Sequence, residues 1–456
     1  MAKNIKELKH KTRRLGIKEG MLFSAESAVG NEFIKPFAIA LNTSNSIVAL
    51  LSSVQGLLGP LSQIKGSKLI EKYSRKKILV KKVFLESLMW LPLILFSCLF
   101  YKGILLNALP FFILIWVATF SIITSMGYPA WFSWMGDVVD EKYRGRWFSK
   151  RSFLMGIISF TLAILASLFL DYTKKNGWIM AGFATLFLFA FIIRITCIRV
   201  IKKQYEPKIK LKKSYRFSFK EFLIKAPKTN FGRFSIFHAT LSFSVYISSS
   251  LYAIYLLRTL EFSYTTYIIV ILSGTFFSLI FLNLWGGIVD KYGSYAAICI
   301  TSIFLPIVPI LWVLSPSPLY LILVPNLISG IANSGFNLAS RNFIYDNVHK
   351  QKRALAVSYH DLLNGIGIFL GAGLSAILIE YLSITSIKPI ILIFIIGGIV
   401  RMIVIFFWIP KLKEIKKKKK FKDFWEIEEF VVKKTKPALV EETRELMSMG
   451  KYLRER

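Results

Sequence analysis

The sequence predicts an all-α membrane protein in which twelve transmembrane helices form two halves of six. Three observations carry this prediction. Long apolar runs recur along the chain, the connections between them alternate between basic and nearly neutral, and polar features of the first half recur in the same order in the second. Of the 456 residues, 54% are hydrophobic, as expected of a chain that places much of its surface in lipid.

The apolar runs are long enough to cross a bilayer as helices. Residues 104–128 contain no charge, and residues 382–410 contain only Lys388 and Arg401. A helix needs about 20 apolar residues to cross a hydrocarbon core about 30 Å thick, and it satisfies its own backbone hydrogen bonds there. The expected spans are 19–42, 45–66, 78–101, 105–134, 152–172, 177–197, 233–257, 264–289, 296–314, 318–340, 354–380 and 386–409.

The positive charges lie mostly on one side of these spans. The connections on that side hold 25 Lys and Arg residues, whereas those on the other side hold five. The positive-inside rule therefore predicts a multi-pass protein of the cell membrane with both termini in the cytoplasm. The net charge of +34 follows these connections and does not indicate nucleic-acid binding.

Two basic segments on the same side extend this organisation. The predicted parts are a cytoplasmic N-terminus (1–18), a six-helix half (19–197), a cytoplasmic middle loop (198–232), a second six-helix half (233–409) and a basic cytoplasmic tail (410–456). The middle loop and the tail each contain a short amphipathic stretch, at 217–224 and 421–427. Both are expected to contact anionic lipid headgroups as interfacial helices. A solvated tether is the alternative for each.

The two halves form an internal repeat. Polar residues recur in the same order, with offsets that drift from 219 to 207 residues. The pairs are Glu71 with Asp290, Asp137 with Asp346, Arg144 with Arg353, and Arg194 with Arg401. Parallel repeats of six helices are an architecture of secondary transporters.

At this point the sequence resembles the major facilitator superfamily, over about residues 15–410. The family's cytoplasmic loop signature is Gly-x-Leu-x-Asp-Arg/Lys-x-Gly-Arg-Arg/Lys, and the second loop matches it from Gly286 through Asp290 and Lys291 to Gly293. The first loop keeps four positions and replaces the others with Ser67, Glu71 and Ser74; the residues kept are Leu69, Lys72, Arg75 and Lys76. The stretch 131–151 is also similar to one large prokaryotic branch of the superfamily, and this likeness implies no particular substrate.

The resemblance implies a cytoplasmic gate built from these loops. In the family's helix arrangement, Glu71 faces the start of span 11 and Asp290 the start of span 5, where helix N-termini favour a carboxylate. Such contacts would favour the outward-open state, since they exist only while the halves meet on the cytoplasmic side. The alternative is that the loops are only topology anchors. The proposed gate residues are Glu71, Lys72, Arg75, Asp137, Arg144, Gly286, Asp290, Lys291, Gly293, Asp346 and Arg353.

The resemblance also implies a substrate cavity lined by spans 1, 4, 7 and 10. Span 1 is the most polar helix, and ionisable residues inside a span are functional candidates. Lys35 would favour an anionic group, and Glu32, three residues before it, would either carry a proton or form a static pair with it. Pro36 is expected to bend the helix beside them. The cavity candidates are Asn31, Glu32, Lys35, Trp131, Trp134, Ser242, Tyr246, Ser248, Asn333 and Asn337.

Buried acids are the candidates for proton coupling. They are Glu26, Glu32, Glu86 and Asp361. Each could instead pair with a buried arginine, and Arg194 and Arg401 favour such a structural role because a charge at depth needs a partner. In span 11, the GxxxG spacing of Gly367 and Gly371 predicts close helix approach.

These features favour a secondary active transporter that moves a small solute by alternating access, coupled to protons or ions. No HExxH motif, nucleophile elbow or Walker loop occurs, so an enzyme or ATP-driven pump is not indicated. The three cysteines have no metal-ligand spacing, so neither a metal site nor a cofactor is expected. The alternative is a lipid translocase or a non-transporting scaffold on the same fold.

Overall fold

A computed structural model describes residues 2–207, 218–349, 352–385 and 388–415. This part of the chain is built from helices and contains no strand. Eleven of its helical segments are long and apolar enough to cross a membrane, by length and composition. They match the eleven expected spans that follow residue 42, with ends shifted by seven residues or fewer.

The first half runs from α1 to α9, and serine caps begin two of its helices. Ser44 Oγ accepts from Ile47 N before α3, and Ser74 Oγ accepts from Lys77 N before α4. The elements are α1 (Ala2–Val29), η1 (Asn31–Phe33), α2 (Ile34–Ala40), α3 (Asn45–Leu69), α4 (Arg75–Leu88), α5 (Trp90–Tyr101), α6 (Leu109–Met126), α7 (Tyr128–Val138), α8 (Glu141–Lys175) and α9 (Ile179–Lys202).

The second half follows the short helix α10, and two of its spans contain a π turn. The elements are α10 (Phe219–Lys225), η2 (Ala226–Lys228), α11 (Asn230–Ser249), α12 (Tyr252–Ile254), η3 (Tyr255–Thr259), α13 (Tyr264–Tyr292), α14 (Ser294–Phe304), α15 (Ile307–Leu314), α16 (Pro318–Leu321), η4 (Ile322–Asn326), α17 (Leu327–Asn347), α18 (Arg353–Thr385), α19 (Pro389–Trp408) and η5 (Ile409–Lys411).

The first expected span is an interrupted helix. α1 ends at Val29, a single 3₁₀ turn follows, and α2 begins at Ile34. The break occurs at Gly30, where a Cβ atom would lie 2.4 Å from the Trp90 ring, so only glycine fits against this indole. Pro36 has no N–H to bond the carbonyl of Glu32, which weakens the helix at the same place.

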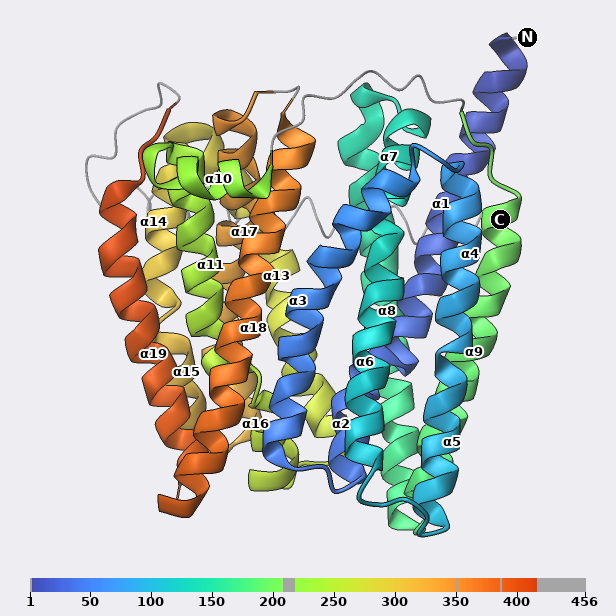
Figure 1. Cartoon of the computed structure of the whole chain (residues 1–456), viewed down its shortest axis with the longest axis vertical. Helices are drawn as coiled ribbons and strands as arrows, with labels where there is room; N and C mark the ends of the chain where they lie inside the picture. The colour runs from blue at the N-terminus through green and yellow to red at the C-terminus, as the bar shows by residue number, and fades with distance from the viewer. Residues whose placement is uncertain (1, 208–217, 350–351, 386–387, 416–456) are drawn as a thin grey trace. The chain divides into compact units, whose positions relative to one another are not determined.

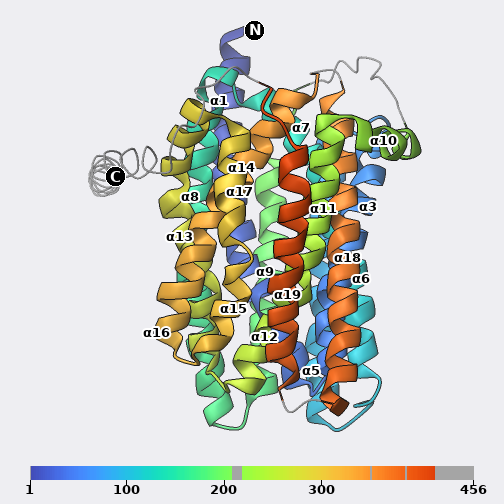
Figure 2. The ribbon, with the colours of Figure 1, turned by 90° about the vertical axis from the view of Figure 1, so that its left-hand side faces the viewer.

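Contacts divide the chain into two compact units. The first contains Met1–Arg216, His238–Ile269 and Ala354–Gly397, and the second contains Phe217–Phe237, Val270–Arg353 and Gly398–Arg456. Within each unit the long helices run side by side (Figures 1 and 2). The unit boundaries fall inside α11, α13 and α19, so the division of the chain at 198–232 stays a prediction based on the repeat.

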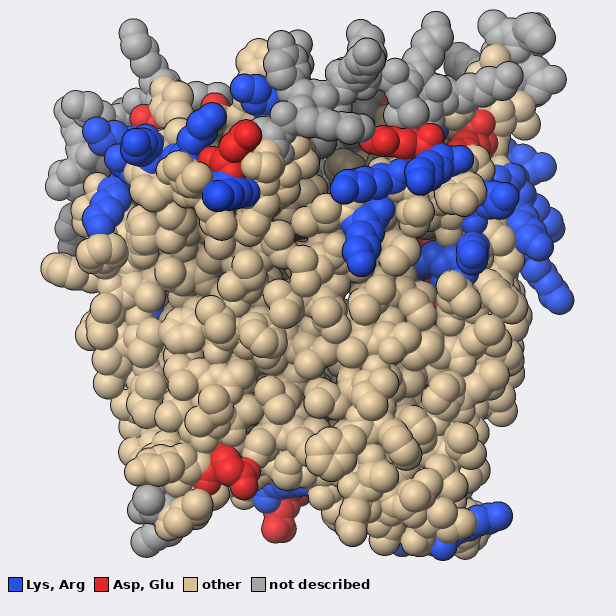
Figure 3. All heavy atoms as spheres, viewed as in Figure 1, with Lys and Arg blue, Asp and Glu red and all other residues tan. Residues whose placement is uncertain are grey.

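Charged side chains are concentrated at helix ends in each unit. Figure 3 shows Lys and Arg gathered over the helix ends near α7 in one unit and near α10 in the other, while the helix middles present uncharged side chains. The apolar middles match a hydrocarbon layer, and the basic ends match an interface with lipid headgroups.

Candidate functional site

The interrupted first span presents three of the predicted cavity residues. Asn31 and Glu32 lie in η1 and Lys35 in α2, and all three are half-buried. The Asn31 side chain donates from Nδ2 to Ser27 Oγ at 3.3 Å, and its buried Oδ1 has no partner. Glu32 and Lys35 interact electrostatically but form no ion pair within 4.0 Å among the described contacts. A carboxylate, an ammonium and an unpaired amide oxygen thus lie within five residues of one another at the break in this span.

Glu26 lies one turn before the break and is fully buried. Its Oε1 accepts a hydrogen bond from Trp90 Nε1 at 3.0 Å, while its buried Oε2 has no partner. A buried carboxylate with one unsatisfied oxygen is costly when ionised and satisfied more easily when protonated. Glu26 thus keeps an unsatisfied carboxylate oxygen and stays a candidate for proton exchange.

Glu86 is instead held by two cations. Lys82 Nζ lies 2.6 Å from Glu86 Oε2, and Arg194 donates to the same oxygen from Nε at 2.8 Å and from NH2. The Arg194 guanidinium also lies over the Phe23 ring, 5.1 Å from its centroid. The pairing that was the alternative for this acid is present, and it links α4 and α9 to α1.

The two tryptophans predicted for the cavity have different surroundings. Trp131 is half-buried and carries the Arg151 guanidinium 4.5 Å from its ring centroid. Trp134 is fully buried and donates from Nε1 to the Tyr205 carbonyl at 3.0 Å. It packs in a hydrophobic core cluster with Val83 and Met135, so its described contacts are those of a core residue.

A polar ladder joins α11 and α18. Ser242 donates to Asn364 Oδ1 at 2.5 Å, and one turn earlier the buried rings of His238 and His360 stack with Nδ1 and Nε2 2.9 Å apart. The predicted close approach at Gly367 and Gly371 is confirmed, since a Cβ at either glycine would lie 2.1 Å from a carbonyl oxygen of α11. The histidine pair was not predicted, and residues 122 apart give no local signal for it.

The remaining cavity candidates of the second half lie on α11 and α17. Tyr246 is half-buried, and Ser248 is fully buried beside Gly397. Asn333 and Asn337 are exposed and four residues apart, which places them on one face of α17. Asn333 donates to Ser329 Oγ at 2.9 Å. Amides exposed on a membrane helix are costly in lipid, so this face fits contact with water or a polar ligand.

Two residues of the predicted gate, Arg75 and Asp137, form an ion pair in the first half. Arg75 is fully buried, and its NH1 bonds Asp137 Oδ2 at 2.6 Å. Glu71 and Lys72 are exposed in the adjoining loop. The side chain of Arg144, in the first turn of α8, lies outside the described residues.

In the corresponding loops of the second half, Arg353 and Lys291 contact residues near them in the sequence. Arg353 NH2 donates to the carbonyls of Tyr345 (2.9 Å) and Val348 (3.1 Å) at the end of α17, the helix that also carries Asp346. Asp290 is exposed near the end of α13, and Lys291 lies over the Tyr292 ring, 4.6 Å from its centroid. Gly286 has open space around it, whereas Gly293 adopts φ +95° before α14.

In each half, one acidic residue that was not predicted caps the start of the third span. Glu206 accepts from the backbone N–H groups of Arg75 and Lys76 at the start of α4. Glu414 accepts from Tyr295 N at the start of α14, at 2.9 Å. The two carboxylates follow the last span of their half with an offset of 208 residues, which the repeat could have revealed.

A further polar cluster lies at the opposite helix ends of the first unit. Arg258 donates to Asn45 Oδ1 and to the Thr43 carbonyl, both at 2.5 Å. Asp171 accepts from the backbone N–H groups of Tyr264 (2.7 Å) and Thr265 (2.9 Å) and so caps the first turn of α13. These contacts join segments of both halves, and the sequence analysis had assigned no role to either residue.

Solved structures share this arrangement of helices. The nucleoside transporter NupG aligns with a TM-score of 0.63 at 15% identity, covering 89% of this chain and 100% of its own. A bacterial homologue of the iron transporter ferroportin, in an inward-facing state, has a TM-score of 0.65 at 17% identity, covering 87% and 98%. A bacterial metal transporter gives 0.62 at 14%, also covering 87% and 98%. At these identities the likeness concerns the fold alone.

Sequence comparison identifies the family. Among curated proteins, none matches this chain. The family model described as Major Facilitator Superfamily matches twice, over residues 21–245 and 234–453. These matches cover most of the chain, and they agree with the helical fold and the transporter neighbours, so the protein is a multi-pass membrane transporter rather than an enzyme. The chain belongs to the Major Facilitator Superfamily.

Proposed function

We propose that this protein is a secondary active transporter that moves a small solute across the cell membrane by alternating access. The observation that carries the proposal is the interruption of the first span at Gly30, beside Asn31, Glu32 and Lys35. Discontinuous helices at mid-membrane are a recurrent way of building substrate and ion sites in transporters. Lys35 favours a solute with an anionic group, and the basic connections favour both termini in the cytoplasm.

Glu26 is the proposed proton carrier of the cycle. The groups that face it are Trp90 by hydrogen bond, and Arg194, Glu86 and Lys82 by charge. Since Glu86 already occupies both cations, Glu26 can gain or lose a proton without breaking an ion pair. Glu26→Gln is therefore expected to abolish proton-driven uptake while keeping solute exchange between the two sides.

Polar residues near the helix ends form the two proposed gates. Arg75–Asp137 and the loop acids Glu71 and Asp290 belong to the cytoplasmic gate, and Arg258 with Asp171 forms the opposite one. Asp290→Asn is expected to increase cysteine labelling from the cytoplasmic side, and Arg258→Ala from the other side. Unchanged accessibility in both variants would exclude these residues as gates.

A thermal-shift screen of the purified protein against soluble metabolites tests the substrate site, with Lys35→Ala measured in parallel. A ligand at a hundred times its dissociation constant stabilises a protein by about 2.7 kcal/mol. An anionic compound that stabilises the wild type and not the variant would support the site, and its flux could then be measured. If no soluble compound raises the melting temperature, the result favours the alternative of a lipid translocase or a scaffold. Flipping of labelled lipid then becomes the deciding assay.

A further inference from the structure

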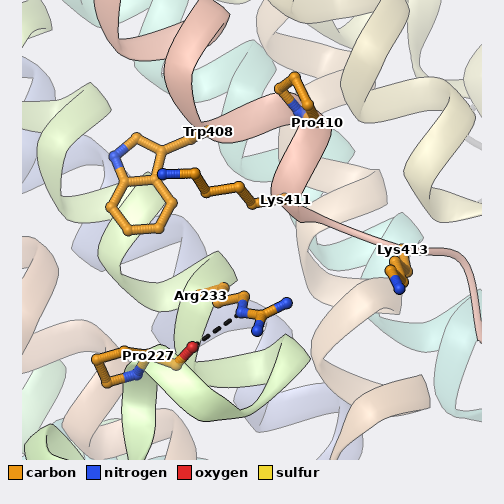
Figure 4. Close-up of a pocket in the computed structure, with 6 residues that line it drawn as sticks. All are labelled: Pro227, Arg233, Trp408, Pro410, Lys411 and Lys413. Atoms are coloured by element: carbon orange, nitrogen blue, oxygen red, sulfur yellow. Dashed lines mark hydrogen bonds between the residues drawn. The ribbon is translucent and has the colours of Figure 1, made fainter.

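A basic pocket lies in the second unit, where α19 ends and the segment after α10 turns into α11. Its volume is about 370 Å³, and it is lined by Pro227, Arg233, Trp408, Pro410, Lys411 and Lys413 (Figure 4). Of these six residues, three carry a positive charge and none is acidic. Glu414 follows directly, but its carboxylate is bound at the start of α14. The pocket therefore favours an anion.

The Arg233 side chain and the backbone of Lys413 are held in place before any ligand arrives. Arg233 Nε donates to the Pro227 carbonyl at 2.8 Å, which leaves its two terminal nitrogens pointing away from that bond (Figure 4). Asn230 fixes the backbone of Lys413 on both sides, donating to its carbonyl at 2.8 Å and accepting from its N–H at 3.0 Å. Leu412 between the two lysines is buried. A site that is ordered in advance loses less entropy on binding.

An apolar stripe on α19 leads directly to the pocket. Ile403, Phe407 and Lys411 follow one another at intervals of four residues, so they lie along one face of the helix. Ile403 is 59% and Phe407 55% exposed, and Lys411 Nζ lies over the rings of Phe407 and Trp408. Tryptophan and lysine at the end of an exposed apolar helix face are typical of the membrane interface.

We propose that this pocket binds the phosphodiester headgroup of an anionic phospholipid, whose acyl chains lie along the exposed face of α19. The terminal nitrogens of Arg233 suit two phosphate oxygens, and Lys411 and Lys413 neutralise the charge. A free phosphate would be recognised by the same cations, but it would make no use of the apolar stripe that ends at Lys411. The site is independent of any transported solute.

Native mass spectrometry of the full-length protein in detergent, titrated with phosphatidylglycerol or phosphatidylcholine, tests this site. The variant carries Arg233→Gln and Lys411→Gln together. The matched control carries Lys102→Gln and Lys175→Gln, which remove the same charge from exposed positions just after α5 and at the end of α8. Binding of phosphatidylglycerol is expected to weaken about tenfold in the pocket variant and to change less than about twofold in the control.

Three results would overturn the proposal. Equal loss in the control would mean diffuse attraction by basic residues, equal binding of phosphatidylcholine would mean that no anion is recognised, and displacement of the lipid by equimolar inorganic phosphate would assign the pocket to soluble phosphates. Arg233→Lys, which keeps the charge, should retain most of the binding if the double variant loses the lipid rather than its fold. Lipid retention is measured without transport, so failure of the transporter proposal would leave this result intact.

Discussion

The two halves of this transporter bury an arginine at the same place of the repeat but bind it differently. Arg194, which is 2% exposed, donates to the Glu86 carboxylate. Arg401, which is 3% exposed, donates from NH1 to the Leu305 carbonyl at 3.1 Å. The offset of 219 residues that relates Glu71 to Asp290 also relates Glu86 to Leu305. At this position the first half thus offers a carboxylate and the second half a backbone carbonyl.

The contact between the first and fifth spans of each half also differs in charge. In the first half, Arg151 packs against Gly20 and pairs with Glu19 at 3.1 Å. Offsets of 218 and 209 residues place His238 and His360 at the positions of Gly20 and Arg151. Because one imidazole must accept the bond from the other, at least one of this histidine pair is neutral. The first half therefore concentrates buried ionised groups beside the proposed substrate site.

Among the substitutions that test this comparison, removing the carboxylate of Glu86 should destabilise the protein most. Glu86→Gln leaves Arg194 and Lys82 buried without their counter-charge, which is expected to cost about 3–5 kcal/mol of stability. Chemical unfolding of the purified protein measures the loss. Glu71→Gln, the same substitution at an exposed position, is the control and should be nearly neutral. Equal stability of the two variants would show that the Glu86 carboxylate does not stabilise the protein by pairing with Arg194 and Lys82.

The seam between α11 and α18 offers the second test. The Gly371 Cβ position lies 2.1 Å from the Phe243 carbonyl oxygen, whereas the offset of 209 residues places Leu162 at the corresponding position of α8. Gly371→Ala is expected to separate the helices and to cost about 1–3 kcal/mol. Gly136→Ala, where no described residue lies within 4 Å of the Cβ position, should leave the melting temperature unchanged or slightly raised. A stable Gly371→Ala protein would mean that close approach is dispensable in this half.

The smallest expected difference in stability between the halves comes from two serines at equivalent positions of the repeat. Ser24 donates to the Met155 carbonyl at 2.6 Å, and Ser242 donates to the Asn364 side chain. Ser24→Ala is expected to cost about 0.6 kcal/mol, a typical interhelical hydrogen bond. Ser242→Ala also deprives Asn364 Oδ1 of its donor, so a loss of about 1–2 kcal/mol is expected. Melting temperatures of the two variants measure these losses in parallel. Equal losses would show that the bond to Asn364 is worth no more than the bond to the Met155 carbonyl.

Much of the fold followed from the sequence, because span length and loop charge are local properties. A bend in the first span was expected at Pro36, whereas an interruption at Gly30 was not, because it places Gly30 against the Trp90 ring, 60 residues away. Arg75 and Asp137 were both expected in the cytoplasmic gate, but their ion pair joins residues 62 apart on different helices. Trp134 stays a cavity prediction, and its indole N–H donates to the carbonyl of Tyr205, 71 residues away. Local spacing does not encode such contacts.

The cap formed by Glu414 has a practical consequence for anyone who shortens or tags this protein. A chain that stopped at Pro410 would retain every span but lose the carboxylate on α14 and the Lys413 backbone held by Asn230. Such a protein should express poorly even though its hydropathy profile is complete. Fusion partners and cleavage sites therefore belong after Ile415, and equally well-behaved chains ending at Pro410 and Ile415 would show that the cap contributes little.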